Sequence, residues 1–130
     1  MQQARIIKLD EEIILLEEAT AIADAVCATA TATVAEGVRE CEVAGEARRA
    51  LCRLGDEYAH VMTPFVSSGE HMAPPHRICS DKLIRHGDVV LIDIGAAWSG
   101  YFGDMARTIW FPQMTCRCFR KRPFWRNRDS

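Results

Sequence analysis

The sequence predicts an α+β domain with a mainly antiparallel sheet that carries helices on one face. Two segments with helical spacing of apolar residues come first, and short segments rich in β-branched residues follow them. The clearest strand is the aliphatic run of residues 89–92, which lies between Gly87 and Gly95. The chain has 130 residues, of which 48% are hydrophobic and 26% charged, as expected for one soluble globular domain.

Residues 10–36 are expected to form the first helix, which ends at Gly37. Asp10 is a suitable N-cap, and Leu9 can pack on Ile14. A stripe of side chains at helical spacing should face the core: Ile13, Leu16, Thr20, Ala23, Cys27, Ala30 and Val34.

A second helix is expected at residues 42–54, and Gly55 would end it. Charged residues of both helices should face solvent. Residues 59–66 suggest a strand, which Pro64 would restrict to an edge of the sheet or to a bulge. The inner side of the second helix would hold Val43, Ala47, Ala50, Leu51 and Leu54.

The most informative stretch is residues 87–111, which should form an antiparallel hairpin. Its first strand, residues 89–92, is expected to be buried on both faces and to end at Asp93. The chain can then reverse near Gly100, and the returning strand should be interrupted near Gly103.

The hairpin carries one carboxylate on each arm, Asp93 and Asp104. An ionised carboxylate beside four aliphatic residues is costly, and a second carboxylate nearby raises the cost. Divalent cations between the two would remove it, because hard carboxylate oxygens bind Mn, Mg, Fe, Co or Zn. The alternative is that Asp93 caps a turn and that Asp104 pairs with Arg107 in solvent.

This stretch resembles the pita-bread metallopeptidases, which include methionine aminopeptidase, Xaa-Pro aminopeptidase, prolidase and creatinase. The matching pattern is Gly87-Asp88, the apolar run, Asp93-Ile94-Gly95, Gly100-Tyr101, Asp104 and Arg107-Thr108. The Gly-Val-Arg-Glu turn between the two helices adds a weaker match. The resemblance implies the N-terminal half of a pita-bread fold. It also implies that Asp93 and Asp104 are metal ligands and that the complete enzyme uses two divalent cations: Mn, Co, Zn or Fe.

A loop at residues 70–80 holds a histidine on a stiffened backbone, because Pro74 and Pro75 come directly before His76. Taken alone, His76 could be an exposed loop residue. Its place between Ser68-Gly69 and Gly87-Asp88 follows the family order, which implies that it lines the substrate pocket. There it would assist proton transfer or hold the scissile carbonyl, as the catalytic residue of the site. Surface positions are expected for His60, His71 and His86.

The resemblance covers residues 10–111 and then stops. We therefore divide the chain into the N-terminal half of the catalytic domain, residues 1–111, and a basic tail, residues 112–130. The formal charge is −7 in the first part and +5 in the tail. Phosphate contacts and aromatic stacking by such a tail could bind nucleic acid. We do not expect nucleic acid as a partner, because a frameshift or truncation would give the same composition.

In the family, a histidine and two glutamates from the second half of the domain complete a set of five ligands. This chain has no histidine after His86 and no glutamate after Glu70. We therefore expect the chain alone to be inactive, to bind metal weakly and to associate. In the complete enzyme, the resemblance implies metal-assisted hydrolysis, in which the cations lower the pKa of a shared water. Arg107 would shape and neutralise the wall of this site, and Tyr101 would either do the same or, as we expect, only pack.

The residues around His76 resemble the Xaa-Pro peptidase branch more than methionine aminopeptidase. Both aspartates favour a metal-dependent peptidase over the creatinase type, so a peptide is the expected substrate. Two alternatives stay open, a small-molecule hydrolase or lyase on the same scaffold and a non-catalytic module that binds peptides or other partners. Members of the proline-specific branch are often dimers, which would allow a homodimer of the complete enzyme.

The sequence contains no apolar run long enough to cross a bilayer and no secretory signal, so a cytoplasmic protein without a membrane partner is expected. The cysteines form no CxxC pair, and we expect thiols rather than a disulfide framework. The six positions are Cys27, Cys41, Cys52, Cys79, Cys116 and Cys118.

Overall fold

The computed structural model describes residues 5–58, 63–74 and 77–110. Two helices come first, α1 (Asp10–Thr33) and α2 (Glu40–Arg53). They are followed by strand β1 (Phe65–Ser68), the short 3₁₀ helix η2 (Gly69–Met72), and strands β2 (Val89–Trp98) and β3 (Tyr101–Trp110). The strands form one antiparallel sheet in the order β1-β2-β3.

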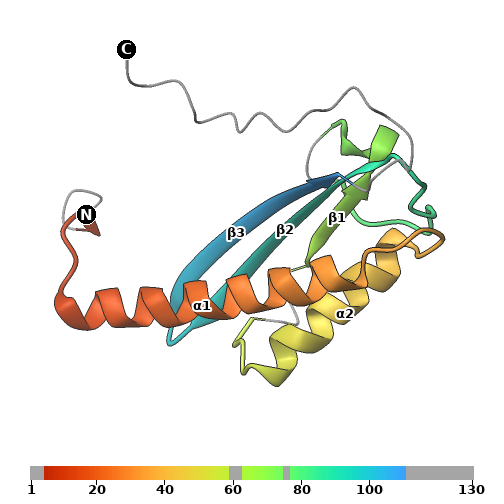
Figure 1. The fold of residues 1–130 in the computed structure, drawn as a ribbon. Coiled ribbons are helices and arrows are strands. Elements are labelled where there is room, and N and C mark those ends of the chain that lie inside the picture. The colour runs from red at the N-terminus through yellow and green to blue at the C-terminus, as the bar shows by residue number, and fades with distance from the viewer. Residues whose placement is uncertain (1–4, 59–62, 75–76, 111–130) are drawn as a thin grey trace, which may run out of the picture.

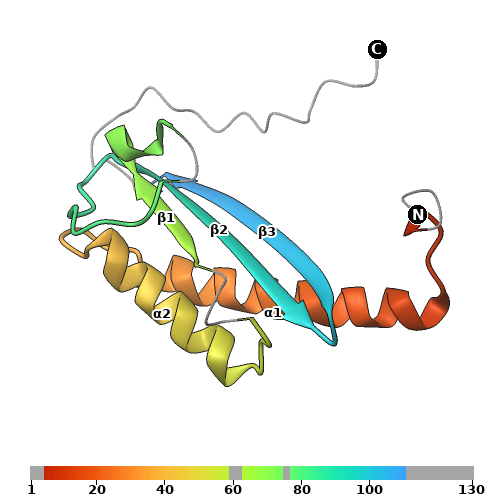
Figure 2. The same ribbon diagram turned by 180° about the vertical axis from the view of Figure 1, so that it is seen from behind.

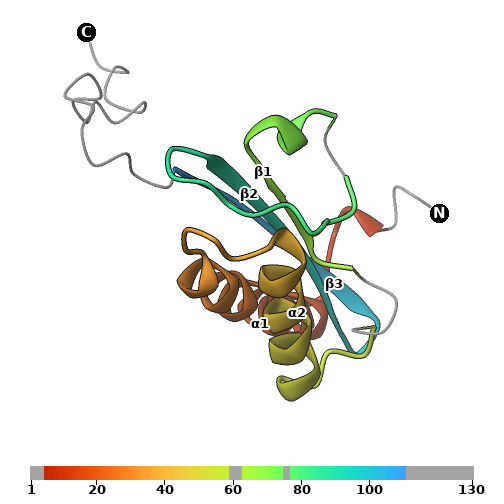
Figure 3. The same cartoon turned by 90° about the vertical axis from the view of Figure 1, so that its right-hand side faces the viewer.

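Both long helices lie on the same face of the sheet, with α1 across β2 and β3 and α2 against β1 (Figure 1). The view from the side separates the helical layer from the strands (Figure 3). Seen from behind, the opposite face of the sheet is covered by neither α1 nor α2 (Figure 2). The prediction of an α+β fold with an antiparallel sheet and helices on one face is confirmed.

Helix α1 begins at Asp10, one residue earlier than an N-cap at Asp10 would give, because Leu9 occupies the N-cap position. The backbone N–H of Leu9 donates to the Glu12 carboxylate at 2.8 Å, and the acidic first turn complements the helix dipole. The side chains of Leu9 and Ile14 are 67% and 58% exposed, so the expected packing between them is absent.

The buried face of α1 follows the expected stripe only in its second half. Ala23, Cys27 and Ala30 are buried as predicted, whereas Ile13 is 43% exposed and Thr20 is also exposed. The first turns of α1 extend past the end of the described sheet (Figure 1). The side chains of α1 that are buried are Ala19, Ile22, Ala23, Val26, Cys27 and Ala30.

Helix α2 presents the expected apolar side to the core. Its fully buried apolar residues include Val43, Ala47 and Leu51, while Leu54 is 45% exposed and lies outside the core. Strand β1 begins just after Pro64 and ends two residues later than expected, and it is an edge strand that pairs only with β2 among the described strands.

Strands β2 and β3 form a longer hairpin than predicted, paired from Val89 opposite Trp110 to Trp98 opposite Tyr101. Asp93 is the fifth residue of a strand of ten, so the expectation that it ends the strand is wrong. Pairing with β3 carries β2 through Gly95, which had suggested a strand end. The expected interruption of β3 at Gly103 is also absent, because this glycine stays in the ladder opposite Ala96.

The two faces of β2 differ in burial. Val90, Ile92 and Ile94 point toward the helices and are fully buried. Val89 and Leu91 point the other way and are half-buried. The expectation that residues 89–92 are buried on both faces is therefore wrong for the described part of the chain, where helices cover only one face.

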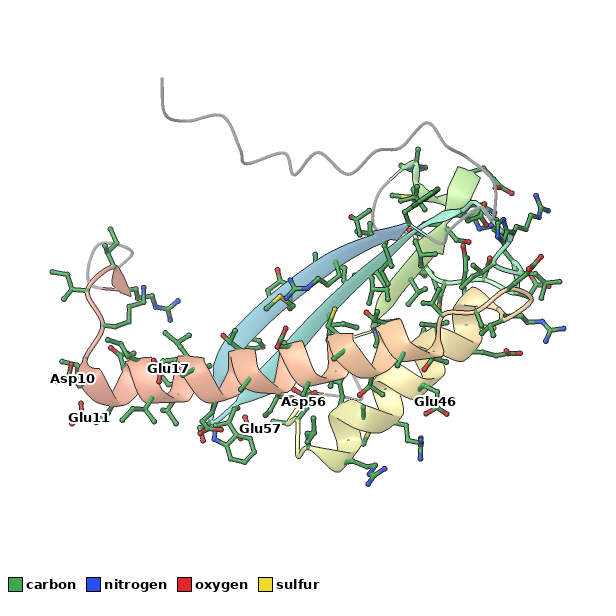
Figure 4. The ribbon with its side chains drawn as sticks, viewed as in Figure 1. Asp10, Glu11, Glu17, Glu46, Asp56 and Glu57 are labelled. Carbon is green, nitrogen blue, oxygen red and sulfur yellow. The ribbon has the colours of Figure 1, made fainter. Side chains whose placement is uncertain are left out.

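The tip of the hairpin is held by the segment that follows α2. The Asp56 carboxylate accepts a hydrogen bond from the Ala97 N–H, and the Glu57 N–H donates to the Ala97 carbonyl at 3.2 Å. Glu57 Oε2 also accepts from the Gly100 N–H at 3.0 Å. Figure 4 shows Asp56 and Glu57 beside the hairpin tip. These bonds fix the orientation of β2 and β3 against α2.

The hairpin turn provides a stability test. Ser99 and Gly100 both have positive φ, 50° and 79°, as a two-residue type I′ turn requires. Because asparagine tolerates this conformation better than serine, Ser99→Asn should raise the free energy of unfolding by about 0.5 kcal/mol. Ser99→Val should lower it, because β-branched side chains are disfavoured there. Urea denaturation measures both, and equal stability of the two variants would contradict this turn geometry.

The described cysteines are free thiols, as expected, with Cys27 buried, Cys79 half-buried, and Cys41 and Cys52 exposed. Cys116 and Cys118 lie outside the described residues. No helix in the described part of the chain is long and apolar enough to span a membrane.

Candidate metal centre

The hairpin places Asp93 and Asp104 on the same face of the sheet. Asp93 lies opposite Ala106, and Asp104 lies opposite Gly95. Because side chains two residues apart on one strand share a face, the aspartates are diagonal neighbours. Diagonal neighbours in an antiparallel pair are about 7–8 Å apart, within reach of a common group. This face is the one that α1 and α2 leave uncovered.

The surroundings of the two aspartates fit part of a metal centre. Asp93 is half-buried and Asp104 is exposed, and Gly95 adds no side chain between them. Both donors are carboxylates, which are hard ligands suited to divalent cations. Among residues 5–58, 63–74 and 77–110, no group of three His, Cys, Asp or Glu side chains could hold a metal ion. The described chain thus places two candidate ligands side by side, and a complete site would need further donors.

The alternative roles considered for the aspartates do not match the structure. Asp93 lies in the middle of strand β2 and not at a turn. Arg107 points to the helix side of the sheet, where its Nη2 lies 3.1 Å from Asp24 Oδ1 of α1. An ion pair between Arg107 and Asp104 is therefore absent, and the expectation that Arg107 shapes the wall of the site is wrong.

Tyr101 also lies away from the aspartates. Its hydroxyl donates to Glu12 Oε1 at 2.9 Å and joins the start of β3 to the first turn of α1. This position fits the structural role expected for Tyr101, because odd-numbered residues of β3 face the helices.

The histidines divide into two groups. His76, the predicted catalytic residue, and His60 lie outside the described residues. His71 was expected at the surface, but its side chain is only 21% exposed and its Nδ1 lies 3.2 Å from Glu40 Oε2. His86 is half-buried. The surface assignment of His71 is wrong, because this histidine lies against a buried carboxylate.

That carboxylate, Glu40, is 1% exposed and lies in the first turn of α2. Its Oε1 accepts from the Ser68 N–H at 2.7 Å and from Ser68 Oγ at 2.9 Å. Its Oε2 accepts from Ser80 Oγ at 2.9 Å and from the Ser80 N–H at 3.3 Å, and it also faces His71. The one sequence signal was the Gly-Val-Arg-Glu turn, in which Glu40 is the last residue.

A second buried group, Lys82, lies next to this carboxylate. Its side chain is 6% exposed, and its Nζ donates to Ser68 Oγ and to Asp88 Oδ2, each at 2.8 Å. Asp88 Oδ2 also accepts from the Arg85 N–H at 2.9 Å. Ser68 therefore joins two anchors, one built on Glu40 and one on Lys82. We call the following residues the Glu40 cluster: Glu40, Ser68, His71, Ser80, Lys82 and Asp88.

The Glu40 cluster should make stability depend on pH. Burial raises the pKa of Glu40, but hydrogen bonds from Ser68, Ser80 and His71 outweigh burial and lower this pKa overall from 4.5. The pKa of Asp88 is also lowered, because its hydrogen bonds to Lys82 and Arg85 outweigh burial. A carboxylate with a lowered pKa stabilises the fold above its ordinary pKa, and this contribution is lost as pH falls through the folded value.

We therefore expect the free energy of unfolding to fall as the pH drops below about 4.5, and to fall less steeply in Glu40→Gln. Urea denaturation over a pH series measures the slope. Glu42→Gln is the matched control, since Glu42 lies in the same turn but half in solvent beside Arg39. A Glu40→Gln variant with the wild-type slope would contradict the prediction.

Comparison with known proteins identifies the family of this chain. Residues 15–119 match metallopeptidase family M24. The chain is 40% identical to the Xaa-Pro dipeptidase of Pyrococcus furiosus over 109 residues, which are 84% of this chain and 31% of that protein. It is 37% identical to an uncharacterized peptidase of Bacillus subtilis, again over 84% of this chain and 31% of the relative.

Solved structures show the same relationship. The prolidase from Pyrococcus furiosus superposes with a TM-score of 0.76 at 38% identity, covering 85% of this chain and 33% of that one. The X-Pro aminopeptidase from Thermotoga maritima gives 0.74 at 28% identity, covering 86% and 32%. The chain thus spans about a third of the length of these relatives and corresponds to a part of their pita-bread fold. The chain belongs to metallopeptidase family M24.

Proposed function

We propose that this chain forms the N-terminal part of the catalytic domain of a metal-dependent Xaa-Pro peptidase. The observation that carries the proposal is the placement of Asp93 and Asp104 as diagonal neighbours on the uncovered face of the hairpin. The relatives named Xaa-Pro dipeptidase and prolidase support this substrate class.

In this proposal Asp93 and Asp104 would be among the residues that hold two divalent cations, Mn, Co, Zn or Fe. Such cations supply a hydroxide near neutral pH and polarise the scissile carbonyl. The chain itself has two tasks. The hairpin holds both carboxylates at a fixed separation, and His76 donates a hydrogen bond to the substrate carbonyl as negative charge develops on its oxygen.

The described residues support the proposal that the chain alone is inactive, because they supply two carboxylates and no third donor beside them. The uncovered face also exposes apolar area: Phe102 is 55% and Trp110 46% exposed. Such a face favours association with another surface. We therefore propose that further ligands and a covering layer come from residues that correspond to the rest of the relatives' length. We also propose that the complete enzyme works in the cytoplasm.

A chimera tests the proposal. Residues 5–110 would replace the matching segment of the prolidase from Pyrococcus furiosus, and hydrolysis of a panel of Xaa-Pro dipeptides would be followed with each divalent metal. We expect Xaa-Pro hydrolysis by the chimera and none by the 130-residue chain. A folded chimera that binds metal but cleaves no Xaa-Pro peptide would refute the substrate class. Turnover with tight, stoichiometric metal binding by the chain alone would refute the need for further ligands.

A further inference from the structure

Two of the free thiols, Cys41 and Cys79, lie on segments that the fold holds together. Cys41 is in the first turn of α2, and Cys79 belongs to the segment that leads to β2. This segment runs beside the start of α2 (Figure 1). The Cys41 N–H donates to the Ser80 carbonyl at 3.0 Å, so the backbone of Cys41 touches the residue that follows Cys79.

Two more hydrogen bonds fix the same two segments against each other. The Glu40 N–H donates to the Lys82 carbonyl at 3.0 Å, and the Glu40 carboxylate accepts from Ser80 Oγ at 2.9 Å. Glu40 directly precedes Cys41 in the chain, and these bonds order the backbone on both sides of the two thiols. A disulfide requires Cα atoms within about 7 Å of each other, and contact between one cysteine and the neighbour of the other brings the pair to about that range.

The two side chains lie close enough to interact, and they differ in exposure. Burial raises the pKa of the Cys79 thiol most, and the negative charge of the neighbouring Cys41 thiolate raises this pKa further. Cys79 is half-buried against the apolar core, whereas Cys41 is exposed. A small oxidant can therefore reach Cys41, while Cys79 is held beside it as a second, shielded thiol.

We propose that Cys41 and Cys79 form a reversible disulfide, with hydrogen peroxide as the oxidant. The Cys41 thiolate attacks one peroxide oxygen, the O–O bond breaks, and one water leaves a sulfenic acid on Cys41. The Cys79 sulfur gives up its proton and attacks the Cys41 sulfur, the S–O bond breaks, and a second water leaves. The two thiols lose two electrons and two protons in total, and the peroxide is reduced to water.

The disulfide would tie the segment before β2 to α2, where the Glu40 cluster already joins them. Because it closes a long loop, it restricts the unfolded chain, and oxidation should raise the melting temperature by about 10 °C. In a reducing compartment the thiols are the resting form, and a disulfide of this kind is transient. The proposal does not depend on the proposed peptidase function.

The test treats the full 130-residue chain with hydrogen peroxide, blocks the remaining thiols with iodoacetamide and digests the chain with trypsin without reduction. Cleavage after Lys and Arg places the thiols in separate peptides, because residues 40–48 hold Cys41, residues 50–53 hold Cys52 and residues 78–82 hold Cys79. Cys52 is the matched control, since it is an exposed thiol on the same helix about 16 Å further along.

We expect mass spectrometry to find residues 40–48 linked to residues 78–82 as the main disulfide, and dithiothreitol to remove this link. In Cys79→Ser the sulfenic acid on Cys41 should persist and react with dimedone, and Cys52→Ser should leave the link unchanged. Absence of the link, equal amounts of links from Cys52, or equal linking in urea would each overturn the proposal. A linked chain that melts no higher than the reduced chain would also overturn it, because the bond would then not fit the folded structure.

Discussion

Asp104→Asn in the chimeric peptidase is expected to lower kcat/KM for an Xaa-Pro dipeptide by at least about 100-fold, because removing even a partner that only supports a ligand costs 10–100-fold. Asparagine keeps the size of the side chain but loses the negative charge and one of the two oxygens that could bind a cation. Asp93→Asn should lose activity for the same reason. Isothermal titration with Mn or Co should show weaker binding in both variants.

The matched control is Asp24→Asn, an aspartate that pairs with Arg107 on the helix side of the same hairpin. Both side chains of this pair are more than half exposed, so its loss should leave kcat/KM within about twofold, as for a surface ion pair. An Asp104→Asn chimera with activity and metal affinity near those of Asp24→Asn would show that Asp104 is not a ligand.

Gly103→Ala is expected to destabilise the fold by about 3 kcal/mol, the upper range for overpacking a core. A Cβ at Gly103 would lie 2.6 Å from the carbonyl carbon of Ala19 and 2.6 Å from the backbone nitrogen of Thr20. These atoms belong to the backbone of α1, so no side-chain rotation can relieve the clash. Either α1 or β3 would have to move, and the buried apolar contacts between them would be lost. Urea denaturation of the wild-type and variant chains measures the loss.

Gly45→Ala serves as the control for this substitution. Gly45 lies within α2, and a Cβ there would meet nothing within 4 Å. Alanine is favoured over glycine inside a helix, so this variant should gain about 0.5–1 kcal/mol. If Gly103→Ala matched the wild type in stability, α1 could not lie as close to β3 as the structure shows.

These residues show which parts of the fold can be predicted from the sequence. Local patterns were sufficient for both helices and for the hairpin, since helical spacing and a positive-φ turn at Ser99 and Gly100 act over a few residues. Strand ends were misjudged at Gly95 and Gly103, because a glycine suggests a turn or bulge when its neighbours in space are unknown. In the structure, Gly95 stays in the ladder opposite Asp104, and Gly103 admits the backbone of α1.

The candidate site was predictable in part for the same reason. Asp93 and Asp104 could be selected from sequence because a strand, a turn and a strand bring them together within eleven residues. Their shared face follows from the register, which the ladder sets. Arg107 was misassigned because residues of one strand alternate between faces, and its partner Asp24 comes from another element.

The sequence by itself determined the class of fold, the two helices, the hairpin and the pair of carboxylates, because these depend on residues that are near one another along the chain. Only the tertiary structure decided the faces of β2 and β3 and the burial of Glu40. A charged residue in a first helical turn looks solvated until distant donors surround it, and those donors come from Ser68 and Ser80, 28 and 40 residues away. Burial and pairing are properties of neighbours in space, which no local pattern specifies.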